Sequence, residues 1–115
     1  MAEEEPQGRP PRTLGMRHLA LFVRAFGECE HFYADLLGMA VEWRPDPDNV
    51  YLSSGPDNLA LHRVREPSAA FDDAHAQRLD HLGFFLPDFA AVDAWYAFLG
   101  GHGVRMKTAP QLFWR

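Results

Sequence analysis

The 115-residue sequence contains little of what would mark a disulfide-stabilised, nucleic-acid-binding or membrane-anchored protein. Its single cysteine, Cys29, excludes an intrachain disulfide and a cysteine-based zinc knuckle, and it is compatible with a reducing compartment. Lysine and arginine together number 11 against 16 acidic residues, and a net charge of −5 offers no basic surface for nucleic acid or an anionic membrane. The amino-terminal stretch MAEEEPQGRPPR has no apolar segment of the kind found in a secretory signal or anchor. We therefore expect a cytoplasmic protein with no nucleic-acid or membrane partner.

The remaining composition is that of a small globular domain. Hydrophobic residues make up 47% and aromatic residues 13% of the sequence. A chain of this length can bury an adequate core if nearly all of it folds. We expect residues 1–13 to form a disordered tail and residues 14–115 to form a single domain.

An internal repeat organises that domain. Shifting the chain by 63 residues carries MRHLALFVR onto LDHLGFFLP, and nine of 26 consecutive positions are then identical. The matches include histidine, tyrosine and glycine as well as apolar residues: His18/His81, Leu19/Leu82, Phe22/Phe85, Phe26/Phe89, Tyr33/Tyr96, Ala34/Ala97, Leu36/Leu99, Gly38/Gly101 and Val41/Val104. Two copies are too few for a solenoid, so the repeat predicts two modules paired in one pseudo-symmetric domain.

The first copy, about residues 15–65, has the pattern of one strand, one helix and three further strands. Residues 17–23 are apolar throughout, as in a strand covered on both faces, with His18, Ala20 and Phe22 on one of them. A helix is predicted over residues 25–37, with Gly38 as its carboxyl-terminal cap, because apolar residues recur at helical spacing: Cys29, Phe32, Tyr33, Leu36 and Leu37. Strands are predicted over 41–44, 50–53 and 59–64, separated by proline, glycine and asparagine clusters.

The second copy repeats this order after a solvated linker at 66–78, and it starts at about residue 79. A strand is predicted over 79–86, and a helix follows, with Pro87-Asp88 as stop and cap and Gly100-Gly101 closing it. Residues 104–107 begin another strand. By the 63-residue offset Arg115 corresponds to Leu52, so the last strand of the first copy has no counterpart and the second module is incomplete.

The duplicated βαβββ order, with HLALFV, FYADLLGM running into VEWRP, NLALHRV, LDHLGFFL and DAWYAFLGGHGV, resembles the vicinal oxygen chelate superfamily. That superfamily includes glyoxalase-like lyases, extradiol dioxygenases, and fosfomycin and bleomycin resistance proteins. The resemblance covers roughly residues 15–110. It implies an α+β fold in which two βαβββ modules form a curled mixed sheet, here with a second module that lacks its last strand. It also implies a cup that a second subunit often completes, which predicts a homodimer.

In metal-using members of this superfamily, ligands to a divalent ion come from the first strand of each module and the last strand of one or both. The resemblance therefore implies His18 and His81 as ligands, with the last-strand position of the first module at Ala60 or His62. The glutamate common in the second module has no counterpart. Imidazole is a ligand for zinc, iron, nickel and cobalt, and we leave the metal open among zinc, iron, nickel, manganese and cobalt.

Packing or solvation is the simpler explanation for the other residues of chemically active types. Cys29 lies on the apolar stripe of its helix, where a buried, inert thiol is expected. No role is assigned to three further histidines: His31, His75 and His102. Aromatic packing accounts for Tyr33 and Tyr96. Side chains at Trp43, Phe84 and Phe85 are candidates to line a ligand cup, and Arg44 and Arg63 are candidates to meet an anionic substrate, with core packing and solvation as the respective alternatives.

Three functional hypotheses follow. In the first, the protein is a metal-dependent glyoxalase-like lyase, isomerase or dioxygenase that binds two neighbouring oxygens of a small substrate. The second is a non-catalytic protein that binds an apolar or aromatic small molecule, favoured by the absent carboxylate and by Ala60. The third is a truncated form without activity. The sequence assigns no catalytic residue and no organic cofactor.

Overall fold

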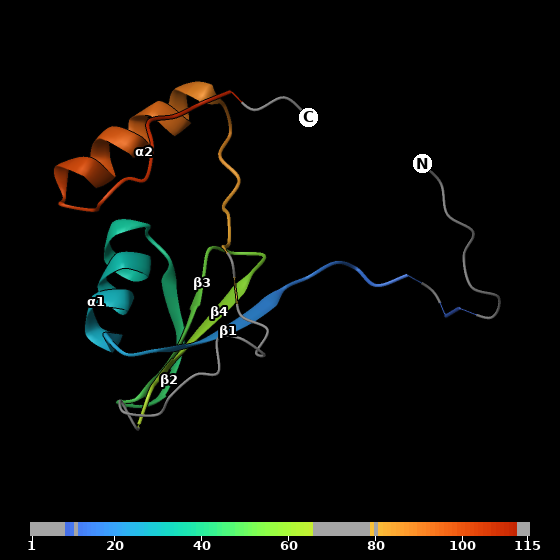
Figure 1. Cartoon of the computed structure of the whole chain (residues 1–115). Helices are drawn as coiled ribbons and strands as arrows, with labels where there is room; N and C mark the ends of the chain where they lie inside the picture. The colour runs from blue at the N-terminus through green and yellow to red at the C-terminus, as the bar shows by residue number, and fades with distance from the viewer. Residues whose placement is uncertain (1–8, 11, 66–78, 80, 113–115) are drawn as a thin grey trace, which may run out of the picture. The chain divides into compact units, whose positions relative to one another are not determined.

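A computed structural model describes residues 9–10, 12–65, 79 and 81–112 of the chain (Figure 1). The chain divides into two compact units, residues 1–67 and 68–115, and each is described by itself. Most of the predicted tail and the predicted linker at 66–78, which contains His75, lie outside the described residues. The domain and module boundaries stay predictions.

Unit 1 is built on a four-stranded mixed sheet. Its strands are β1 (His18–Val23), β2 (Ala40–Asp46), β3 (Asn49–Ser53) and β4 (Asn58–Arg63). Their order across the sheet is β1-β4-β3-β2; β1 runs parallel to β4, and the other neighbours are antiparallel. The predicted sequence of one strand, one helix and three strands is confirmed, as is the α+β class.

The helix between β1 and β2 changes its winding partway. Helix α1 (Phe26–Glu30) continues into the π-helical segment η1 (His31–Leu36), where the Leu37 N–H donates to the Phe32 carbonyl five residues back. Gly38 then adopts a φ of 82°, and the Met39 N–H donates to the Tyr33 carbonyl. A left-handed glycine of this kind ends a helix without the clash that a Cβ would cause. The predicted helix and its cap are confirmed.

One face of the sheet packs against this helix and forms the core. Figure 1 shows α1 alongside the strands of unit 1. The sheet contributes four buried side chains and the helical connection two: Val50, Leu52, Leu59, Leu61, Phe26 and Met39. Full burial of one such side chain stabilises the fold by about 1.5–3 kcal/mol. Leu19, Leu21 and Val23 of β1 pack against the same cluster and are half-buried.

The other face of β1 is exposed. His18, Ala20 and Phe22 alternate with the core-facing residues, and Phe22 is 74% exposed. The expectation that β1 is covered on both faces was therefore wrong for this face. Both faces of β1 carry apolar side chains, such as the exposed Phe22 and the half-buried Val23. The sequence therefore does not show the alternation of exposed and core-facing residues along this strand.

Strand β2 carries two register shifts. Val41 pairs with Leu52 and Trp43 with Tyr51, so two steps along β2 correspond to one along β3. A second extra residue lies between Trp43 and Asp46, which pairs with Asn49. Each is a β-bulge, and a bulge turns adjacent side chains toward the same face.

Unit 2 contains the helix α2 (Phe89–Gly101). Its cap is the predicted one, because the Asp88 carboxylate accepts from the Ala91 N–H at 2.8 Å. The glycine that closes the helix is Gly103, with a φ of 80°, and not the expected Gly100-Gly101. The Gly103 N–H donates to the Gly100 carbonyl, and the Val104 N–H donates to the Leu99 carbonyl. This pair of bonds is a Schellman motif.

Neither predicted strand of unit 2 forms within the described residues 79, 81–88 and 102–112. The predictions of strands over residues 79–86 and 104–107 were therefore wrong. A strand persists only where a neighbouring strand pairs with its backbone groups. Among the described residues, β1 pairs with β4, whereas no described residue of unit 2 forms a strand with which the second copy of β1 could pair.

Candidate ligand-binding face

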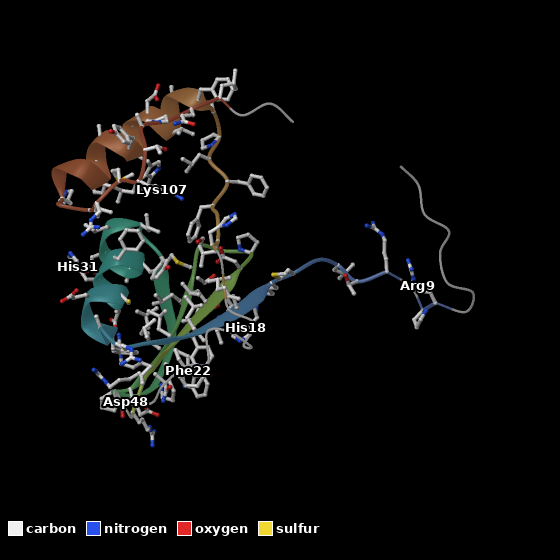
Figure 2. The ribbon with its side chains drawn as sticks, viewed as in Figure 1. Arg9, His18, Phe22, His31, Asp48 and Lys107 are labelled. Atoms are coloured by element: carbon white, nitrogen blue, oxygen red, sulfur yellow. The ribbon has the colours of Figure 1, made fainter. Side chains whose placement is uncertain are left out.

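The exposed face of the sheet in unit 1 carries a cluster of rings around Tyr51. Trp43 stacks on Tyr51 with ring centroids 5.0 Å apart, and His18 stacks on it at 6.3 Å. The ring of His62 meets Tyr51 edge-on at 6.0 Å, and Phe22 lies 5.5 Å from His62. We call this set the aromatic face: His18, Phe22, Trp43, Tyr51 and His62. Figure 2 shows two of its members, His18 and Phe22, along β1.

Strand register explains why these rings gather. Ala20, Ala60 and Tyr51 lie side by side on β1, β4 and β3. His18 precedes Ala20 by two residues and His62 follows Ala60 by two, so all five side chains stand on one face. The first bulge of β2 places Trp43 opposite Tyr51. The two alanines contribute only methyl groups, which leaves the rings around them as the groups that a ligand would contact.

His18 is held by a chain of polar groups. Its Nδ1 lies 2.6 Å from the Asn58 Oδ1, and Asn58 is the neighbour of His18 in the β1–β4 register. The Asn58 amide nitrogen donates in turn to Glu42 Oε1 at 2.6 Å. Glu42 is the extra residue of the first bulge in β2.

His62 is held in the same way by a different set of residues. Its Nδ1 lies 2.6 Å from the Asn49 Oδ1, and the two residues stand opposite each other on β4 and β3. The Asn49 amide nitrogen donates to both carboxylate oxygens of Asp46, at 2.8 and 2.9 Å. This amide and then the backbone N–H of Asp48 lower the pKa of the Asp46 carboxyl. Asp46 follows the second bulge.

Unit 1 alone does not fit a divalent metal ion. His18 and His62 are separated by four residue pairs along β1 and β4, on the order of 13 Å at the usual strand rise. Two nitrogens on one tetrahedral zinc ion are only about 3.3 Å apart. Among the described residues, no group of three or more His, Cys, Asp or Glu side chains is arranged to hold a metal.

His81 belongs to unit 2, where it is exposed. The predicted ligand set of His18, His81 and His62 therefore stays a prediction. The sequence left the last-strand ligand of the first module open between Ala60 and His62. Ala60 lies nearer to His18, two residue pairs along the strands, but its side chain has no atom that can bind a metal. His62 has such an atom but lies four residue pairs away.

The arginines considered for an anionic substrate are engaged elsewhere. Arg44 forms a two-pronged ion pair with Glu30, which ties β2 to α1 and raises the pKa of the arginine. Arg63 donates to Asp48 at 2.8 Å and lies over the ring of Phe26. Both therefore stabilise unit 1.

The remaining candidates occupy ordinary positions. His31 pairs with Asp35 on the outer side of the helix (Figure 2), and His102 contacts the Phe98 ring. Cys29 packs half-buried against the core, and burial raises the pKa of its thiol. Phe84 and Phe85 are exposed in unit 2. That unit also has a hollow of about 320 Å³, lined by Phe89, Val92, Asp93, Pro110, Gln111 and Leu112.

Sequence reasoning missed four residues of the candidate site: Glu42, Asp46, Asn49 and Asn58. It treated both asparagines as parts of turns. The available signal was that each asparagine lies at the start of a strand, where its side chain can reach a neighbouring strand. The two acids had no such signal, because bulges decide which way they point.

The fold and the ring-lined face define a class: α+β proteins with a βαβββ unit whose mixed sheet packs a helix on one face and leaves the other face exposed. A family model described as the Glyoxalase/Bleomycin resistance protein/Dioxygenase superfamily matches residues 15–114. The chain belongs to this superfamily, which confirms the resemblance seen in its sequence.

Solved structures support the fold. The chain is similar to a lactoylglutathione lyase from Agrobacterium tumefaciens, with 23% identity, a TM-score of 0.62, and coverage of 87% of this chain and 77% of the other. It resembles an integron cassette protein from the mobile metagenome of the Halifax Harbour sewage outfall, with 17% identity, a TM-score of 0.60, and coverage of 79% and 72%.

A third similar structure is a glyoxalase/bleomycin resistance protein/dioxygenase from Alicyclobacillus acidocaldarius, with 27% identity and a TM-score of 0.53. This match covers 78% of the present chain and 64% of that protein. No curated protein matches the chain. Within the described part of the chain, no helix has the length and apolar character needed to cross a membrane.

Proposed function

We propose that this chain binds a small aromatic molecule on the aromatic face of unit 1. The observation that carries the proposal is the continuous stack of Trp43, Tyr51 and His18 on an exposed sheet face. Trp43 is 58% exposed and Phe22 74%. Large rings so exposed on one face of a sheet are typical of a binding surface.

Ring contacts supply affinity of the right order. A stacked or edge-on aromatic pair contributes about 0.5–1.5 kcal/mol beyond its buried area. A two-ring ligand can contact the stacked rings and also bury apolar area against Phe22. Binding of this kind needs no metal ion. This agrees with the separation of His18 and His62, which is too large for both to bind one ion.

Calorimetric titration with 2-naphthol tests the proposal. We expect saturable binding that is unchanged by a chelator and weakened at least tenfold in Tyr51→Leu. Trp95→Leu, in α2, is the matched control, because Trp95 lies outside the aromatic face. Equal affinity in wild type and Tyr51→Leu, or an absence of saturable binding, would reject the aromatic face as the site.

A second candidate is the metal-dependent lyase, isomerase or dioxygenase activity implied by the sequence. One observation favours it: Asn58 holds the Nδ1 of His18, so its Nε2 is the nitrogen available to a ligand or metal. Orientation of this kind by a second residue is usual for metal-bound histidines.

Elemental analysis of the purified protein separates the two candidates. Near-stoichiometric zinc, iron, nickel, manganese or cobalt, lost in both His18→Ala and His81→Ala, would support the metal-dependent candidate. His31→Ala is the control, since His31 lies on the helix surface. No bound metal in wild type would leave the binding protein as the supported function.

A homodimer and a cytoplasmic location are parts of the same proposal. Support for the dimer is the exposed apolar surface outside the aromatic face, which includes Val41, Phe85 and Phe89. Sedimentation equilibrium over a range of concentrations tests it, and a monomer at every concentration would reject it.

A further inference from the structure

We propose that His18 and His62 are locked in one tautomer, each with its Nε2 aimed as a hydrogen-bond acceptor, so that the aromatic face selects ligands bearing an O–H or N–H donor. Asn58 and Asn49 are the positioning residues that impose this state. The inference rests on the proposed function, because it names the ligand class of the same face, and it applies the same argument to two independent sets of residues.

The carboxylates fix the orientation of the two asparagine amides. An ionised carboxylate can only accept hydrogen bonds. The group of Asn58 that lies 2.6 Å from Glu42 must therefore be its NH₂, and so must the group of Asn49 that lies 2.8 and 2.9 Å from Asp46. It follows that each amide turns its carbonyl oxygen toward the neighbouring histidine.

Those carbonyl oxygens determine which nitrogen of each imidazole carries the proton. An amide oxygen can only accept, so the Nδ1 that lies 2.6 Å from it must carry the proton, in His18 as in His62. A neutral imidazole has a single N–H. Both Nε2 atoms therefore present a lone pair, and each imidazole makes no second hydrogen bond within the part of the chain that the structure describes.

The placement of the two acceptors on the ring cluster gives the ligand class. His18 stacks on Tyr51, and His62 lies between Tyr51 and Phe22. A ligand ring that packs on these side chains brings its substituents to the imidazoles. A phenolic O–H or a ring N–H satisfies an Nε2 lone pair, whereas an ether, a ketone or a carboxylate brings a second acceptor against it. The face therefore selects hydroxylated or N–H-bearing aromatic compounds.

Nitrogen-15 NMR of the histidine side chains tests the tautomers without any ligand. Under mildly alkaline conditions we expect His18 and His62 to show a protonated Nδ1 and an unprotonated Nε2. Asn49→Leu should return His62 to the mixture of tautomers found in free histidine and leave His18 unchanged, and Asn58→Leu should do the reverse. Each variant is thus the control for the other. Circular dichroism of both variants shows whether each position tolerates the substitution.

Paired titrations test the ligand class. We expect 2-naphthol to bind about tenfold more tightly than 2-methoxynaphthalene, the factor that one hydrogen bond of ordinary strength supplies. The preference should fall in Asn49→Leu or Asn58→Leu, while the affinity for the ether changes little. Equal affinity for the two compounds, or a protonated Nε2 in either histidine of the wild type, overturns the inference. If neither compound binds, the proposed function fails together with the ligand class, and the NMR signature still decides the tautomers by itself.

Discussion

His62 and Asn49 stand directly opposite each other on β4 and β3, with the Nδ1 of the histidine 2.6 Å from the Oδ1 of the asparagine. Paired positions on antiparallel strands have Cβ atoms about 4.5–5.5 Å apart, which suits a direct side-chain bond. A second histidine–asparagine pair, His18 and Asn58, forms across the parallel strands β1 and β4. The sheet thus uses both kinds of strand pairing to orient an imidazole on its open face.

Removing a central core side chain should strongly destabilise unit 1. Leu61 on β4 is fully buried within the cluster that packs under α1. We expect Leu61→Ala to lower the free energy of unfolding by about 2–5 kcal/mol, because it loses burial and leaves a cavity. Urea denaturation measures this change. Leu112→Ala, at a position 79% exposed, should have an effect within about 0.5 kcal/mol; a comparable loss in both variants would contradict the assigned core.

Gly38 should be intolerant of a side chain for a conformational reason. Its φ is 82°, and a Cβ built there meets no atom within 4 Å, so backbone strain is the cost to consider. We expect Gly38→Ala to destabilise unit 1 by about 1 kcal/mol.

Gly27→Ala in α1 is the matched control for Gly38→Ala. This position also has open space around a Cβ, and its φ is not in the left-handed region. Alanine should stabilise the helix there by up to about 1 kcal/mol. Thermal unfolding of both variants measures the difference, and shifts of the same sign would argue against the cap.

Acid should weaken the turn between β2 and β3 through Asp46. Hydrogen bonds from Asn49 and from the Asp48 backbone lower the folded-state pKa of Asp46 below its usual value of 3.8. A lowered folded-state pKa means that this stabilisation is fully present above the usual value and is lost as the pH falls through the lowered one. Carbon-13 NMR titration of the Asp46 carboxyl group measures the shift. Asn49→Leu, which removes the largest cause, should bring the pKa closer to 3.8, and an unchanged pKa would contradict the assignment.

Cys29 should react slowly with alkylating reagents. Burial, and then the nearby Glu28 carboxylate, raise the pKa of its thiol, so less of the reactive thiolate is present near neutral pH. We expect iodoacetamide to modify the folded protein several-fold more slowly than the urea-unfolded chain, as followed by mass spectrometry. Modification at equal rates would show that the thiol is freely accessible.

The periodic parts of the sequence determined much of unit 1. The spacing from Cys29 to Leu37 predicted the helix, because an amphipathic stripe is a local property of the chain, and Gly38 predicted its end. The clusters after Arg44 and Ser53 predicted the two turns of the meander, and the order of elements together with the repeat identified the superfamily. Asp88 as the cap of α2 followed from the same local rules.

Tertiary structure alone decided the exposed face and the residues that hold it. Which side of β1 is covered depends on where the helix packs, and apolar side chains on both sides of that strand concealed the answer. Partners for His18 and His62 come from residues 40 and 13 positions away, and two bulges in β2 bring Glu42 and Asp46 to their amides. Whether the second copy forms strands likewise depends on a neighbour that local sequence does not reveal. Helices and caps are fixed by groups a few residues apart, whereas a strand and a sheet-face site are fixed by pairing, and pairing is a property of the folded chain.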